Sequence, residues 1–347
     1  MNLYLLFIII SSLIGIKFFI KDFNKEYLSK ENTSCIKGIF ILIVFYSHIC
    51  TYMPIQPEKD GLMLLLRNLL GQLMVTMFLF YSGYGVYESI KKKKDSYVNA
   101  IPKRRFLKTL INFDIAVVTF AIINLIMGIN YGIKETLLAL TGWGCIGNSN
   151  WYIFAILILY LATYASFKIF DKDNKKAVIL NWILTIATMI IIGVYRGAGL
   201  EYCYNTLLCY PLGMTYSLYK DKIEKILFNN QKYIISLVIL SICFIAFRRL
   251  DLANVIWYSI YSMIFVLLLV ALTMKINLKS KILKWCGDNL FWLYILQRIP
   301  MMIFRRIGYA NLHPYRYALL CFIITIIISI IYDKLTKLLH EKILKLN

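Results

Sequence analysis

Two ionisable residues, Lys37 and His48, lie in an otherwise apolar stretch near the start of the chain. Their spacing of eleven positions is about three helical turns, so a helix would place both side chains on one face, about 16 Å apart along its axis. A cation at the mouth of a cavity suits an anionic substrate, and an imidazole can act as a general base near neutral pH. The alternative is a lysine that extends to the membrane surface and a histidine that only packs and hydrogen-bonds.

A basic cluster follows an apolar stretch and contains Arg104, Arg105 and Lys108. Guanidinium groups match phosphate oxygens with two parallel hydrogen bonds, so the cluster would suit a phosphate-bearing substrate at the cytoplasmic mouth of a cavity. Basic residues at the cytoplasmic ends of membrane helices also set orientation. The cluster is therefore either a phosphate site or a membrane anchor.

Polar and aromatic residues interrupt two other apolar stretches. Ser82 lies beside Gly83, where a small residue permits close helix packing and the hydroxyl can hydrogen-bond across to a neighbour. Trp151 and Tyr152 begin another stretch. They belong either to the aromatic belt of a membrane interface or to a surface on which a sugar stacks.

The remaining ionisable candidates lie near the ends of apolar stretches. Arg196 and Glu201 flank a loop, where they either pair with each other or contact the substrate. Asp288 begins an apolar stretch and is interpreted as a solvated carboxylate at a helix start. His313 and His340 fall in a loop and a tail, and both are expected to be exposed.

Membrane-spanning helices must position these residues. The chain of 347 residues is 60% hydrophobic and 16% charged, whereas soluble domains are about 45–50% apolar and about 25% charged. A span needs about 20 mostly apolar residues. By that measure the sequence predicts an all-α polytopic membrane protein with eleven spans, at residues 3–20, 35–52, 62–87, 106–129, 150–170, 177–196, 202–219, 232–247, 253–274, 285–304 and 317–339.

Lysine-rich loops predict how the spans are oriented. They alternate with loops that carry few basic residues, and the basic side of a membrane protein is the cytoplasmic side. The N-terminus is therefore predicted outside and the C-terminus inside, with the polar segment 132–146 as an outer loop or re-entrant piece. The net charge of +21 is assigned to these loops, facing anionic membrane lipids, and no nucleic-acid partner is expected.

Eight cysteines are scattered along the chain without the spacing of a metal site, and no metal is predicted. A disulfide among Cys50, Cys145 and Cys203 is possible if all three lie on the outer face.

In order and spacing, these motifs resemble the membrane acyltransferase-3 family, which includes bacterial sugar and polysaccharide O-acetyltransferases. The basic residue and histidine at Lys37 and His48, the aromatic Ser-Gly segment, the arginine cluster and Trp151-Tyr152 match in that order. Tyr210–Gly213 and Gly287–Tyr294 match the later elements. The resemblance implies a ten-helix core at residues 35–339, preceded by an extra helix and cytoplasmic loop at 1–34 and followed by a cytoplasmic tail at 340–347.

The resemblance implies that acetyl-CoA is the acyl donor and that a cell-surface or lipid-linked glycan is the acceptor, in a bacterial plasma membrane. His48 would take the proton of the acceptor hydroxyl or relay the acyl group. Lys37, with the arginine cluster, would bind donor phosphates, and Ser82 and Tyr84 would line the passage. A transporter or flippase that uses Lys37 and His48 as a proton relay is the alternative.

The sequence departs from the family pattern near its end. Gln297 stands where the family often has a second histidine, and Asn289 replaces its usual serine. If that second histidine were the required base, the activity would be lost, so the prediction assigns the main catalytic role to His48.

Overall fold

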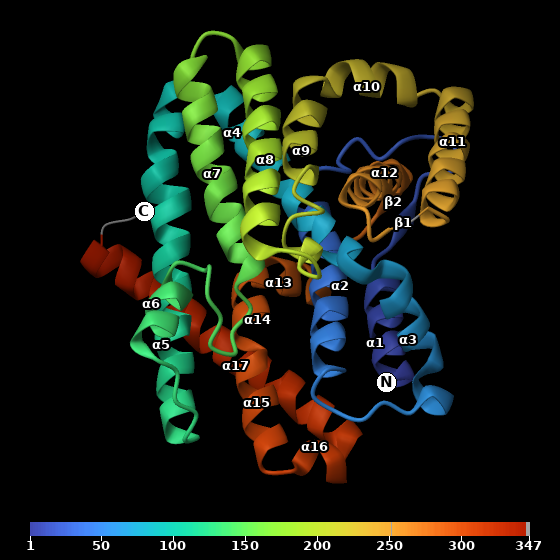
Figure 1. Ribbon diagram of the computed structural model, residues 1–347. Coiled ribbons are helices and arrows are strands. Elements are labelled where there is room, and N and C mark those ends of the chain that lie inside the picture. The colour runs from blue at the N-terminus through green and yellow to red at the C-terminus, as the bar shows by residue number, and fades with distance from the viewer. Residues whose placement is uncertain (251, 345–347) are drawn as a thin grey trace.

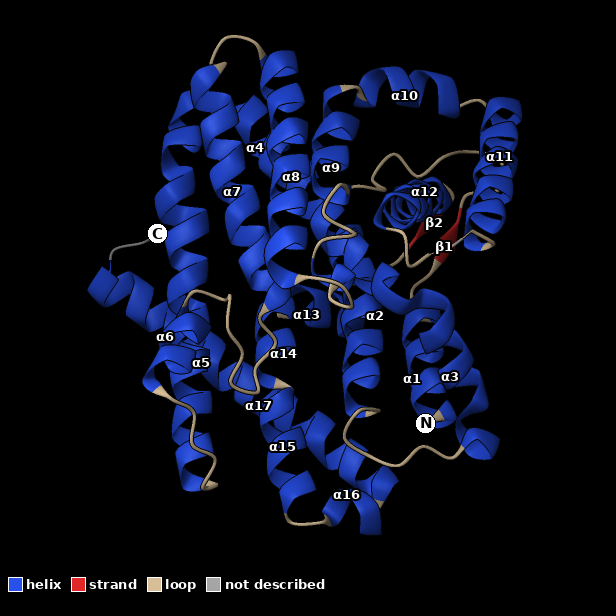
Figure 2. Cartoon of the chain, in the orientation of Figure 1, coloured by secondary structure: helices blue, strands red, loops and turns tan. Residues whose placement is uncertain are grey.

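The computed structural model describes residues 1–250 and 252–344 and consists almost entirely of helices (Figures 1 and 2). Its first half contains α1 (Asn2–Leu13), β1 (Lys17–Phe18), α2 (Lys30–Ile49), α3 (Pro57–Leu70), η1 (Gly71–Val75), α4 (Thr76–Ile101), η2 (Pro102–Leu107), α5 (Lys108–Ile126), α6 (Ile133–Leu140), α7 (Trp151–Ile169) and α8 (Asn174–Arg196). Its second half contains η3 (Glu201–Cys203), α9 (Cys209–Leu218), α10 (Lys220–Leu227), α11 (Asn230–Arg248), α12 (Val255–Thr273), β2 (Ile276–Asn277), α13 (Lys281–Asp288), α14 (Leu290–Leu296), α15 (Arg298–Arg306), α16 (Tyr309–Leu312), α17 (Pro314–Leu339) and η4 (His340–Leu344). Residues 345–347, the end of the predicted tail, lie outside the described residues.

Seven helical stretches of the described chain are long and apolar enough to cross a membrane. Six coincide with single predicted spans. The seventh, Pro57–Ile126, contains the predicted spans 62–87 and 106–129, and non-helical backbone at Lys94 (φ 48°) divides it. These stretches confirm an all-α membrane protein, while the predicted total of eleven spans and their orientation stay predictions.

The predicted first span, 3–20, is wrong in its length. Helix α1 has 12 residues, or about 18 Å, which is shorter than the hydrocarbon core of about 30 Å. Gly15 has a positive φ of 74° just after the helix, and Lys17–Phe18 then pairs with Ile276–Asn277 as two antiparallel strands. The pairing fixes the segment after α1 in an extended conformation, so the helix cannot continue.

Two other predicted spans are broken rather than continuous. The segment predicted at 202–219 forms a short 3₁₀ turn and the ten-residue helix α9. The segment predicted at 285–304 is divided among α13, α14 and α15. A proline ring clashes with the carbonyl four residues before it, and Pro300 is four residues after Leu296, where α14 ends.

Helices α4, α7, α8 and α9 run side by side in one group, with α10, α11 and α12 at the edge beside α9 (Figure 1). Helix α2 lies near the centre and contacts α1, α4, α13 and α14. Helix α11 packs against α12 and exposes its other face along its length, with Tyr233 as its only buried residue. Apolar side chains exposed at this scale fit a lipid environment rather than water.

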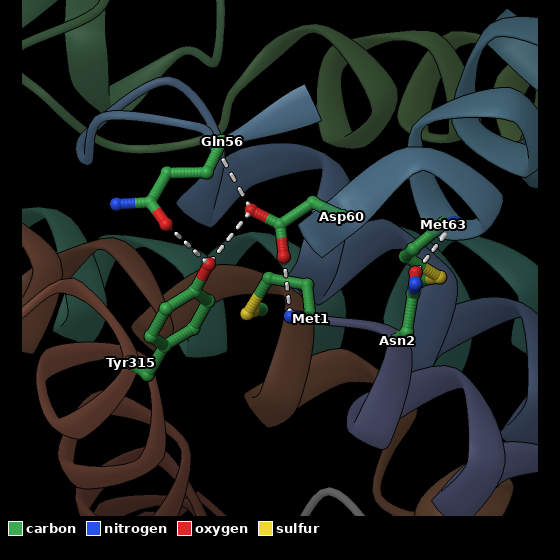
Figure 3. A network of polar contacts seen from close by, with 6 residues as sticks. All are labelled: Met1, Asn2, Gln56, Asp60, Met63 and Tyr315. Carbon is green, nitrogen blue, oxygen red and sulfur yellow. Dashed lines mark hydrogen bonds and ion pairs between the residues drawn. The ribbon is translucent and has the colours of Figure 1, made fainter. Parts of the chain in front are cut away.

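The N-terminal end of the chain is tied to two distant elements (Figure 3). The terminal ammonium of Met1 pairs with the buried Asp60 of α3 at 2.5 Å. Asp60 also accepts hydrogen bonds from the Gln56 backbone N–H (3.1 Å) and from the Tyr315 hydroxyl of α17 (3.3 Å). The Asp60 carboxylate is thus fully used in holding α1, α3 and α17 together.

Candidate active site

Helix α2 begins at Lys30, about two turns before Lys37, and carries His48 in its last turn. The Ser29 side chain caps the helix by accepting the Asn32 backbone N–H. Most of the helix is buried, whereas Lys37 and His48 are both half-buried. Because the eleven-residue spacing of the helix is kept, the two groups face the same side, as the sequence predicts.

Two glycines let α13 cross α2 in direct backbone contact. A Cβ atom on Gly38 would lie 2.0 Å from the Leu283 carbonyl oxygen, and one on Gly287 would lie 1.8 Å from the Ser34 carbonyl oxygen. The crossing brings Asp288 to α2, where it accepts the Ser34 hydroxyl at 2.7 Å. The close approach of the two backbones explains why glycine is needed at Gly287, in the segment Gly287–Tyr294.

The crossing also arranges charges at the Lys37 end of α2. Asp288 pairs with Lys284 at 2.6 Å, and both Asp288 and Arg105 lie close enough to interact electrostatically with Lys37. Asp288 is exposed, as the interpretation of a solvated carboxylate predicts, but its predicted place at a helix start was wrong, because it ends α13, where it bonds Ser34 and Lys284. Lys37 therefore lies near other cationic side chains and one carboxylate, that of Asp288.

A second crossing in direct backbone contact positions Ser82. A Cβ on Gly83 of α4 would lie 2.0 Å from the Tyr210 carbonyl oxygen, and one on Gly213 of α9 would lie 2.1 Å from that of Phe80. With α4 held there, Ser82 is a side-chain hydrogen-bond partner of both Tyr152 and Tyr160 on α7.

The three residues of the basic cluster have different surroundings. Arg105 is half-buried and donates hydrogen bonds to the hydroxyls of Tyr97 (2.8 Å) and Tyr160. Arg104 is exposed, and Lys108 faces His340. Only Arg105 of this cluster is thus joined to the residues around Ser82.

His48 lines a cavity of about 50 Å³ with Ser47, Gln72, Trp151, Tyr294 and four apolar or glycine residues. The Nδ1 atom of His48 is buried without a hydrogen-bond partner. A cavity of this size holds water molecules, so a small polar group can reach the imidazole. The predicted interior position of His48 agrees with this geometry.

Aromatic contacts join the His48 cavity to Ser82. The rings of His48 and Tyr294 have centroids 6.1 Å apart, and those of Tyr294 and Tyr152 are 5.8 Å apart. Tyr152 then contacts Ser82, which contacts Tyr160, which contacts Arg105. We call this series the internal polar path: Arg105, Tyr160, Ser82, Tyr152, Tyr294 and His48.

The predicted substrate residues separate into two groups. Trp151 lines the His48 cavity, and Tyr152 belongs to the internal polar path. Arg196 donates to the Trp143 carbonyl at 2.5 Å and lies over the Trp143 ring at 4.0 Å. It does not pair with Glu201, whose carboxylate accepts the Gly199 backbone N–H at 2.9 Å; this hydrogen bond lowers the pKa of Glu201.

Other predicted positions lie away from the cavity. Tyr84 is buried and stacks on Phe80 with ring centroids 6.5 Å apart. Gln297 is fully buried and donates to the Tyr294 carbonyl at 2.9 Å, so it is held within its own helix turn. His313 is exposed, as predicted.

Outside the cavity, one expectation was wrong and one possibility is not realised. His340 was expected to be exposed but is 2% exposed, because its Nε2 atom bonds the Asn112 side chain of α5 at 2.6 Å. The possible disulfide among Cys50, Cys145 and Cys203 is not formed, and all three are free thiols.

Two arginines beside His48 were not predicted from the sequence. Arg298 and Arg67 both lie close enough to act electrostatically on the imidazole. Arg298 directly follows Gln297, the position at which the sequence departs from the family pattern, and that departure was the available signal. Arg67 carried no signal, since Ser47, the residue to which it donates, lies 20 positions away in the sequence.

Comparison with known proteins gives one match to a family model, the acyltransferase domain designated acyltransferase-3, over residues 33–334. No curated protein and no solved structure matches the chain. The matched range contains Lys37 and His48 of α2, both glycine-mediated crossings and the whole internal polar path. The chain therefore belongs to the acyltransferase-3 family and is a membrane acyltransferase.

Proposed function

We propose that the protein transfers an acetyl group from cytoplasmic acetyl-CoA to a hydroxyl of a cell-surface or lipid-linked glycan. The observation that carries the proposal is the internal polar path, which joins a half-buried arginine near Lys37 to the imidazole near the other end of α2. Family membership favours this enzyme over a transporter with a Lys37–His48 proton relay.

Lys37 and Arg105 are the proposed donor-phosphate residues. Both are cations near the same end of α2, and Arg105 is held by two tyrosine hydroxyls rather than by a carboxylate. The phosphates of coenzyme A would stay there, while its flexible pantetheine arm carries the thioester along the path. The distance to cover along α2 is about 16 Å.

His48 is the proposed base. Its buried Nδ1 has no protein partner and is therefore free to accept the proton of an acceptor hydroxyl. As that O–H bond breaks, the oxygen bonds to the thioester carbonyl carbon; the C–S bond then breaks and the coenzyme A thiolate leaves, to be protonated. In the alternative that remains open, the imidazole first takes the acyl group and then passes it to the hydroxyl.

The acceptor would approach from the side of Trp151 and Arg196. Trp151 lines the cavity, and its ring lies against Tyr202, with centroids 6.2 Å apart. Arg196, stacked on Trp143, also acts electrostatically on Tyr202. An aromatic rim with one cation suits a sugar, which stacks its apolar face on indole rings. The alternating lysine-rich loops support placing this rim outside a bacterial plasma membrane.

The test is transfer of label from radiolabelled acetyl-CoA to glycan in membranes that contain the protein. A general base contributes about 10²–10⁴-fold to rate, so His48→Ala is expected to lose that factor while the protein still inserts and folds. His313→Ala, which removes an exposed histidine, is the matched control and should keep full activity. Equal labelling by His48→Ala and wild type would refute the proposal.

A further inference from the structure

Arginines without acidic partners gather at the His48 end of α2. Arg67, Arg298 and Arg305 approach it from α3 and α15, and within the described chain none forms an ion pair with a carboxylate. Half-buried guanidinium groups are costly to leave unpaired, so their accumulation beside a cavity calls for an explanation.

Arg298 is held by hydroxyl groups around the cavity. Its Nε donates to the Ser149 hydroxyl at 3.0 Å, and its Nη1 donates to the Tyr52 hydroxyl at 3.3 Å. Ser149 also shares a hydrogen bond with Tyr294, which lines the His48 cavity. These neutral partners fix the guanidinium and leave its charge uncompensated.

Arg67 reaches the same cavity from α3. Its Nε donates to the Ser47 hydroxyl at 3.4 Å, and Ser47 lines the cavity beside His48. The nearest buried carboxylate, Asp60, is already paired with the terminal ammonium and bonded by Tyr315. Asp60 therefore does not neutralise Arg67.

Arg305 extends the positive charge from the cavity toward solvent. It is exposed, donates to the Thr51 carbonyl at 3.1 Å and lies 5.6 Å from the centre of the Tyr52 ring. Tyr52 thus has Arg298 and Arg305 beside the same ring. Arg305, Tyr52 and Arg298 therefore lie one after another between the exposed part of α15 and the imidazole, on which Arg298 acts electrostatically.

We propose that Arg298, Arg67 and Arg305 form an anion subsite, and that the acceptor is a glycan bearing carboxylate groups. The proposal rests on the proposed function, because it assigns the acceptor class of the same cavity. The donor phosphates are assigned to Lys37 and Arg105, about 16 Å away along α2. Arginine suits the role, since its planar fork binds carboxylate or phosphate with two hydrogen bonds.

Binding to the purified full-length protein in detergent tests the subsite without requiring transfer. The probes are a short oligogalacturonide, the same oligosaccharide with all carboxyls methyl-esterified, and inorganic phosphate. The acid, but not the ester, is expected to raise the unfolding temperature of the protein. Its affinity should be at least tenfold weaker for Arg298→Gln, and weaker still for the double variant that carries both Arg67→Gln and Arg298→Gln. Stabilisation by inorganic phosphate but not by the acid, or equal stabilisation by the acid and the ester, would overturn the proposal that the acceptor is an acidic glycan.

Matched variants separate the subsite from general loss of charge or fold. Arg306→Gln removes the neighbouring exposed arginine of α15 and should leave the preference for the acid unchanged. Arg298→Lys keeps the charge and should retain part of the preference. If Arg306→Gln reduces the preference as much as Arg298→Gln, the effect is long-range charge and the subsite is refuted.

Transfer assays then distinguish this inference from the proposed function. With the acid as acceptor, Arg298→Gln is expected to raise KM at nearly unchanged kcat, and with the ester it should change neither. An equal fall in kcat for both acceptors would mean that Arg298 stabilises the oxyanion that forms at the thioester carbonyl during transfer. That result would overturn the inference. Absence of transfer to any acceptor by the wild type would refute the proposed function, while the binding result still decides the subsite.

Discussion

At the scale of single residues, neighbours in sequence have very different surroundings. Arg104 and Arg105 are adjacent, yet Arg104 is exposed and Arg105 bonds Tyr97 and Tyr160 inside the protein. Residue types and order predicted a phosphate-binding cluster, but they did not show which arginine turns inward. Both arginines lie on the helical segment η2, where adjacent side chains point in different directions, so one can face the interior while the other faces outward.

Arg105→Gln is expected to weaken the use of acetyl-CoA. Hydrogen bonds to charged groups contribute about 1.5–3 kcal/mol, so KM for the donor should rise roughly tenfold to a hundredfold, with the acceptor KM unchanged. Arg104→Gln, one residue away and exposed, is the control and should behave as wild type. The prediction fails if both variants have the same donor KM.

At the scale of elements, two glycine-mediated crossings set the site. The sequence identified Gly83 within a small-residue segment and Gly287 within a family element, and both contact a neighbouring backbone. It did not reveal Gly38, because a glycine in an apolar helix is locally indistinguishable from any small residue, and it did not show that Gly213, which lies in another family element, packs against α4. Long-range packing, rather than local propensity, gives these positions their role.

Gly83→Ala should destabilise the protein, because its new methyl group would overlap the Tyr210 carbonyl. Overpacking of this kind costs about 1–3 kcal/mol, and thermal unfolding in detergent should occur at a lower temperature. Gly85→Ala in the same helix is the control, since a Cβ there meets no atom within 4 Å. That control should be neutral or stabilising, because alanine favours helix over glycine; equal destabilisation by both variants would contradict the crossing.

At the scale of the whole molecule, sequence predicted the helical membrane fold well and helix lengths less well. Long apolar stretches such as the one at α8 are recognised because hydropathy alone determines them. The segment at 3–20 was assigned one helix because hydropathy does not show that Lys17–Phe18 pairs with a strand more than 250 residues away. The burial of His340 was missed for the same reason, since Asn112 is distant in sequence.

The native Cys145 can report orientation, because it is exposed in the loop between α6 and α7. If that loop is outside, as the lysine pattern predicts, a membrane-impermeant maleimide should label the protein in intact cells. Cys145→Ser, which removes this thiol, should abolish the labelling. Labelling only after the cells are permeabilised would place the loop in the cytoplasm and reverse the predicted topology.

The central claim is that an acyl group passes from the Lys37–Arg105 end of α2 to His48 at the other end. It is tested most directly in sealed vesicles whose cytoplasmic face points outward, with labelled acetyl-CoA added only to the medium. The account predicts labelled glycan inside vesicles containing wild-type protein and none with His48→Ala. Labelled glycan confined to the outer medium, or labelling inside that does not depend on His48, would contradict it.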